Sequence, residues 1–144
     1  MSDLYLDPIL GWRAWKVVDG RLYSTVFGTL WPEQARLEAT CGLGGRSSPG
    51  GLRGVHEAPY GACECGIYAL KSQSRALAIA RQVLPPARAA VGRVSLWGHV
   101  VETECGYRAQ YAYLYDVQLL DGTAEESRTV RRRYAVDAQL FVSV

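Results

Sequence analysis

The chain has 144 residues, the length of one ordinary domain, and can bury a hydrophobic core without a disulfide framework. Hydrophobic residues make up 49% and charged residues 21%, a composition that excludes a disordered or fibrous protein. The formal net charge is only +2, from 16 basic and 14 acidic residues, which argues against bulk DNA as the partner. We therefore expect a single globular domain over residues 1–144.

The beginning of the sequence bears on the compartment. It reads MSDLYLDP, with two aspartates and a proline where a secretory signal peptide needs a basic start and an apolar run. No apolar stretch approaches the roughly 20 residues of a membrane-spanning helix. We expect a cytoplasmic protein with no membrane association. In that reducing compartment, the four cysteines are expected to be thiols or metal ligands rather than disulfides.

The first half of the sequence predicts a β-hairpin and a long loop. In residues 11–31, two runs rich in aromatic and β-branched residues flank Asp19-Gly20, a dipeptide typical of a type I′ turn because both central residues have positive φ. Residues 35–41 alternate weakly and predict another short strand. Residues 42–62 hold seven glycines and two prolines and predict a loop, whose length indicates that something must hold it in place.

A buried strand and a helix are predicted next. Residues 65–70 have the composition of the strand. Residues 74–84 have helical periodicity, with Ser72 or Ser74 as the N-cap and a pair of prolines after the last residue. The helix is expected to bury the face formed by Ala76, Leu77, Ile79, Ala80, Val83 and Leu84.

Two long strands follow the helix. Residues 91–104 and 107–120 predict these strands, with a bulge at Gly98. A two-residue turn at Cys105-Gly106 is expected to join them. The pairing is therefore antiparallel, because so short a connection cannot serve a parallel pair.

The last elements complete the expected fold. Thr123 and Glu126 form the capping box of a second predicted helix, which ends in three arginines at 131–133. Residues 138–143 predict a closing edge strand. The expected fold is α+β and mostly β: a small, partly open antiparallel β-barrel with one or two packed helices. A twisted antiparallel sheet with both helices on one face is the alternative.

Three cysteines and a histidine form a candidate metal site. Cys41, His56, Cys63 and Cys65 bracket the glycine-rich loop with the spacing C-x14-H-x6-C-x-C. Zinc binds thiolate and imidazole ligands tetrahedrally, and four protein ligands leave no open position, so this zinc would be structural. It would also hold the loop. The spacing alone leaves open that these residues are buried thiols without a metal.

A cysteine-dependent enzyme is a weaker alternative for the same residues. Cys63 or Cys65 with His56 has the composition of an activated nucleophile. No third group that would orient the histidine is evident in the sequence. Cys105 falls in the predicted turn, and we leave it out of the site.

The second long strand carries a row of tyrosines. Alternation in residues 107–119 places four tyrosines on one face. Such a row is typical of a stacking surface for bases or a flat protein-binding surface, but we expect a central strand to line the core. Arg13 and Arg108 follow the starts of aromatic strands and are candidates for phosphate contact. The candidate ligand-binding residues are Arg108, Tyr111, Tyr113 and Trp97.

Two stretches, HEAPYGACECGIYAL at 56–70 and VGRVSLWGHVVETECGYRAQYAYLYDV at 91–117, resemble a family of small bacterial proteins to which no activity is assigned. Its members share a cysteine, His-x-x-Pro and Cys-x-Cys-Gly-Ile-Tyr-Ala, followed by Leu-Trp-Gly-x-Val and Gly-Tyr-Arg-Ala. The Trp-rich start at residues 11–17 also fits this pattern. The resemblance implies that one site unites Cys41, His56, Cys63 and Cys65, and it favours zinc.

Two classes of function remain from the sequence. The first is a non-enzymatic interaction module, held by structural zinc, that binds a protein or peptide. The second is a reader of RNA or modified nucleic acid, because the strand–helix–strand order around GIYAL is loosely similar to PUA-like barrels. The small net charge favours a protein or peptide over nucleic acid.

Overall fold

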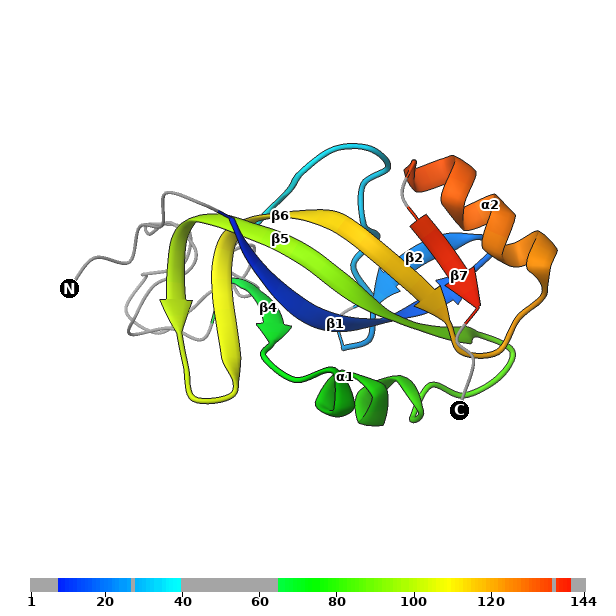
Figure 1. Cartoon of the computed structure of the whole chain (residues 1–144), viewed down its shortest axis with the longest axis horizontal. Helices are drawn as coiled ribbons and strands as arrows, with labels where there is room; N and C mark the ends of the chain where they lie inside the picture. The colour runs from blue at the N-terminus through cyan, green and yellow to red at the C-terminus, as the bar shows by residue number, and fades with distance from the viewer. Residues whose placement is uncertain (1–7, 27, 40–64, 136, 141–144) are drawn as a thin grey trace, which may run out of the picture.

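The computed structural model describes residues 8–26, 28–39, 65–135 and 137–140 (Figure 1). Most of its regular structure is antiparallel sheet, accompanied by two helices, so the predicted mostly-β α+β class is confirmed. The elements in chain order are β1 (Ile9–Val18), β2 (Arg21–Ser24), β3 (Leu37–Glu38), β4 (Ile67–Leu70), α1 (Gln73–Ala80), β5 (Arg88–Glu102), β6 (Gly106–Leu119), α2 (Ala124–Tyr134) and β7 (Asp137–Leu140).

Four of the strands form a hydrogen-bonded ring. β1 pairs with β5, β5 with β6, and β6 with β4, all antiparallel. β4 returns to β1 through a single residue pair, Trp12 with Leu70, so the ring is weakest at this seam. Outside the ring, β2 extends β1, whereas β3 and β7 attach to β6, and β7 runs parallel to it.

The first hairpin forms as the sequence predicts. Asp19 and Gly20 have φ of 52° and 73°, the positive values that a type I′ turn needs. The returning strand is shorter than the predicted run, because β2 ends at Ser24. Beyond it, Leu30 makes only an isolated bridge to Tyr23.

The β5–β6 hairpin departs from regular pairing at two places and turns one residue earlier than predicted. One register shift lies between Trp97 and Val100 and confirms the bulge expected at Gly98; the other lies between Arg93 and Val94. In the turn, the Thr103 N–H donates to the Gly106 carbonyl at 2.8 Å. Glu104 and Cys105 are therefore the central residues, and Gly106 already belongs to β6.

The two helices cover different parts of the ring (Figure 1). α1 contacts β1 and β5 and buries only Ala76 and Ala80. It begins at the Ser72 cap but ends at Ala80, and Ile79 and Leu84 are 39% and 78% exposed, so the wide apolar face predicted for 74–84 is wrong. The buried side of α1 is narrow, since it consists of two alanines, and their small side chains let the helix lie close to the sheet.

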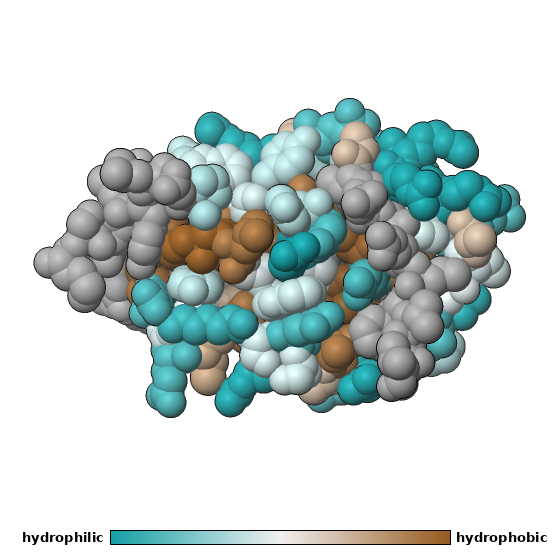
Figure 2. Space-filling view, in the orientation of Figure 1, coloured by the Kyte–Doolittle hydropathy of each residue, from teal (hydrophilic) through white to brown (hydrophobic). Residues whose placement is uncertain are grey.

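α2 has the predicted capping box and closes the other end of the core. Thr123 and Glu126 cap each other's backbone N–H groups, and the outward side of the helix is hydrophilic (Figure 2). Its inward side buries Val130 and Tyr134. The Tyr134 hydroxyl accepts from the Leu22 N–H at 2.8 Å and donates to the Trp31 carbonyl at 3.3 Å. This hydroxyl therefore ties the last helix to the first hairpin.

Neither helix can cross a membrane: of the described residues, none forms a helix long and apolar enough for that.

Burial of Tyr134 predicts a loss of stability at alkaline pH. Burial raises the pKa of its phenol above the ordinary 10.0. The protonated phenol is therefore favoured by folding, and its contribution is present below about pH 10 and is lost as pH rises through the folded-state pKa. At about pH 8, Tyr134→Phe is expected to have a free energy of unfolding about 1–2 kcal/mol below that of the wild type. Between about pH 8 and pH 11, the variant should lose less stability than the wild type does.

Urea denaturation at both pH values checks this expectation. Tyr115→Phe, at an exposed position, is the matched control and should follow the wild type at both. Parallel pH dependence of the wild type and Tyr134→Phe would contradict the role of this phenol.

Candidate binding surface

The tyrosines of β6 lie on the outside of the ring. Tyr111 and Tyr113 are partly exposed, and Tyr115 is 50% exposed, so the expectation that the row lines the core is wrong for these three. The register shift beside Arg93 explains the difference, because it leaves Tyr115 without an opposite residue and reverses the alternation. The side chains of β6 that are buried around and beyond this point are Ala112, Leu114, Val117 and Leu119.

These tyrosines belong to a continuous surface across three strands. Residues opposite each other in an antiparallel pair share a face. Register therefore aligns Leu10 with Ser95 and Tyr113, Trp12 with Arg93 and Asp116, and Trp97 with Tyr111. We call the following set the outer aromatic face: Leu10, Trp12, Arg93, Ser95, Trp97, Tyr111, Tyr113, Tyr115 and Asp116.

Arg93 organises one end of the outer aromatic face. Its guanidinium donates to Asp116 Oδ2 from Nε at 3.1 Å and from Nη2 at 2.6 Å, and its backbone N–H donates to Asp116 Oδ1 at 2.8 Å. These hydrogen bonds raise the Arg93 pKa. The same guanidinium lies 5.5 Å from the Trp12 ring and 5.0 Å from the Tyr115 ring. The cation therefore holds two aromatic rings while a carboxylate balances its charge.

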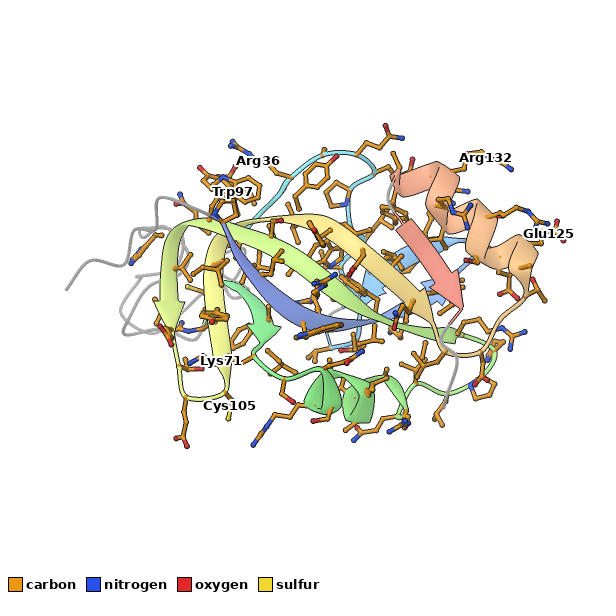
Figure 3. All side chains as sticks on the ribbon, viewed as in Figure 1. Arg36, Lys71, Trp97, Cys105, Glu125 and Arg132 are labelled. Carbon is orange, nitrogen blue, oxygen red and sulfur yellow. The ribbon has the colours of Figure 1, made fainter. Side chains whose placement is uncertain are left out.

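The other end is built in the same way around Tyr111. The Trp97 ring lies 5.8 Å from it with an interplanar angle of 31°, and the Arg36 guanidinium lies 4.2 Å above it. Arg36 approaches Glu38 at 3.9 Å. Figure 3 shows Arg36 and Trp97 together at this end of the surface. Both arginines that stack on the face thus have an acidic neighbour, and the face carries little unbalanced charge.

Arg108 and Arg13, the candidates for phosphate contact, are occupied within the fold. Arg108 is 8% exposed and donates to the Cys65 carbonyl at 3.0 Å. Arg13 donates to the Tyr68 carbonyl and, at 2.9 Å, to the Ser24 hydroxyl, and its guanidinium lies 5.0 Å from the Trp31 ring. Burial lowers the Arg13 pKa to about 10.

The predicted zinc ligands fall mostly outside the described residues. Cys41, His56 and Cys63 are not among them. Cys65 is, and it lies buried just before β4. The described part of the chain contains no cluster of three or more His, Cys, Asp or Glu side chains that would hold a metal. Cys105 lies exposed in the β5–β6 turn, near Lys71 (Figure 3).

Sequence reasoning missed five residues of the outer aromatic face, Leu10, Trp12, Arg93, Ser95 and Asp116, and it also missed Arg36, which stacks on the face. Three of them lie in one cross-strand row, Trp12–Arg93–Asp116, which no single segment reveals. An available signal was the alternation of β5 itself, since Arg93, Ser95 and Trp97 alternate with Val94 and Leu96. Only the pairing register places these residues beside the tyrosines.

Comparison with known proteins adds no identification: no family model, curated protein or solved structure matches the chain. The resemblance based on the CECGIYAL and SLWGHV segments stays a prediction.

The contacts of Arg13 predict a structural role for it. Arg13→Ala should lower the free energy of unfolding by about 1–3 kcal/mol, because two hydrogen bonds and the contact with Trp31 are lost. The loss stays moderate because burying this cation is itself costly. Urea denaturation measures it, with Arg75→Ala on the exposed side of α1 as the control. An Arg13→Ala protein as stable as Arg75→Ala would contradict the structural role.

Proposed function

We propose that the protein is a non-enzymatic binding module whose outer aromatic face contacts a protein or peptide. One observation carries the proposal: five aromatic side chains, from three adjacent strands, meet on one partly exposed sheet face. Aromatic rings bury large areas on contact, and such contiguous surfaces often mark interaction sites.

The composition of the face favours a protein over nucleic acid. Tyr, Trp and Arg are the residues that most often dominate protein–protein binding energy. Phosphate binding depends on cations that are free to release counterions. Here Arg93 is bonded to Asp116, and Arg36 lies near Glu38. The partner surface is therefore expected to be largely uncharged where it meets the rings.

The face also supports binding by being held in place before any partner arrives. Arg93 fixes Trp12 and Tyr115, and Arg36 and Trp97 flank Tyr111. Side chains already fixed lose less conformational entropy on association. The single carboxylate of the face, Asp116, is engaged by Arg93, which supports a binding role over acid–base catalysis.

Selection from a random dodecapeptide display library tests the proposal. Peptides enriched on the wild-type protein should lose affinity about tenfold or more for a Tyr113→Ala, Tyr115→Ala double variant, because both rings lie on the contact surface. Val26→Ala is the matched control, since Val26 is 80% exposed but lies outside the face. Its affinity for the same peptides should equal that of the wild type.

Three results would overturn the proposal. The first is a library that yields no peptide dependent on the two tyrosines. The second is binding of fluorescein-labelled single-stranded RNA that the double variant abolishes, which would favour the PUA-like alternative. The third is concentration-dependent dimerisation in analytical ultracentrifugation that the same substitutions abolish, because the face would then be occupied by a second copy.

We further propose that Cys41, His56, Cys63 and Cys65 bind one structural zinc ion in a reducing, cytoplasmic setting. The support is the ligand spacing and the position of Cys65, whose carbonyl is bonded to Arg108 of β6 and would join the metal to the ring. Elemental analysis of protein purified without added metal should give about one zinc per chain.

Single substitutions complete the zinc test. Cys63→Ser and Cys65→Ser should each lower the zinc content and the melting temperature, because a tetrahedral site loses one of its four ligands. Cys105→Ser, in the exposed turn, is the control and should retain the metal. A folded wild-type protein without zinc would refute the site.

A further inference from the structure

A groove lies at the end of the molecule opposite the β5–β6 turn, away from the outer aromatic face. It has a volume of about 960 Å³ and runs between the β1–β2 turn, the segment before β5 and the first turns of α2. We call it the α2 groove. Apolar side chains line part of it, and Val18 and Leu84 among them are 43% and 78% exposed.

The walls of the α2 groove are fixed to one another. Gly20, with φ of 73°, lies so close to α2 that a Cβ there would be 2.6 Å from the Thr129 methyl group. Arg88 Nε lies 3.4 Å from Glu126 Oε2, which joins the start of β5 to α2. The groove therefore has a stable shape, and a ligand would not need to order it.

The charges left free in the groove are mostly acidic. Glu126 is engaged by Arg88 and by the Thr123 N–H. Among the described residues, Asp19, Glu125 and Lys16 line the groove and have no ion pair. Two carboxylates and one ammonium group without an ion pair thus line the groove, a balance that favours a cationic ligand.

We propose that the α2 groove is a second docking site, for a short peptide segment that carries a basic side chain between apolar ones. The apolar residues contact Val18 and Leu84, and the basic side chain lies near Asp19 and Glu125. Lys16 is placed to donate to a carbonyl of the segment. The proposal concerns different residues from the outer aromatic face and does not depend on it.

Amide chemical-shift mapping of the full chain tests the site with three synthetic probes. They are the capped pentapeptide Leu-Lys-Val-Arg-Leu and two versions in which both basic residues are replaced by glutamine or by glutamate. The basic peptide should shift the amides of Val18, Gly20 and Thr129 in a saturable way. The glutamine version should bind more weakly, and the glutamate version should cause no saturable shift.

Charge-removing variants supply the matched controls. Asp19→Asn keeps a residue that tolerates positive φ, and Glu125→Gln keeps a good helix former, so both should fold. The double variant should bind the basic peptide with an affinity about threefold or more below that of the wild type. Glu104→Gln, at the far β5–β6 turn, should leave its affinity unchanged.

The outcomes separate the groove from the proposed function. Equal affinity for the basic and glutamine peptides, or no change in the Asp19→Asn, Glu125→Gln variant, would overturn the groove proposal. Shifts confined to Trp12 and Tyr115 would also overturn it, while leaving the outer aromatic face as a binding surface. Tyr115→Ala should not alter binding at the groove.

Discussion

The side chain of Arg13 closes the seam of the strand ring. β1 and β4 share only one residue pair, and a guanidinium then bridges them by donating to a β4 carbonyl. The same group reaches Ser24 of β2 and covers the Trp31 ring, so one cation joins three strands. A neutral side chain of similar length would not supply so many donors, so the guanidinium suits this partly buried position.

The outer aromatic face follows from this closure. A closed ring has one inner side, which Trp15, Trp31 and Tyr134 fill together with aliphatic residues. The side chains that alternate with the inward-facing ones on β1, β5 and β6 therefore lie on the outer side. The register shift beside Arg93 turns Tyr115 outward, and α1 covers only another part of the outer surface through its two alanines. The closed ring, the bulge at Tyr115 and the short α1 together leave the outer aromatic face accessible to solvent.

Local signals in the sequence predicted the local structures well. Asp19-Gly20 predicted the first turn, Gly98 predicted a bulge in β5, and Thr123 with Glu126 predicted the capping box of α2. Each of these structures depends on residues only a few positions apart. The second bulge at Tyr115 was not predicted, since β6 itself carries no glycine there and the bulge exists only in the register with β5. Its local signal is Gly92 on the partner strand, where a Cβ would collide with the Asp116 carbonyl oxygen. The structural role of Arg13 was hidden for the same reason: its partners are 11 and 55 residues away. The zinc ligands stay a prediction from spacing and resemblance.

The bond between the Leu22 N–H and the Tyr134 hydroxyl spans 112 positions of the chain. It sets an order for folding during synthesis. The first hairpin emerges early, yet its ring partners β4 and β5 and the helix that covers its core are all made later. The aromatic side chains of β1 therefore stay exposed to solvent in the nascent chain until these partners have been synthesised. Long-range closure of this kind slows folding. The risk of aggregation is therefore highest while only the N-terminal half of the chain has been synthesised.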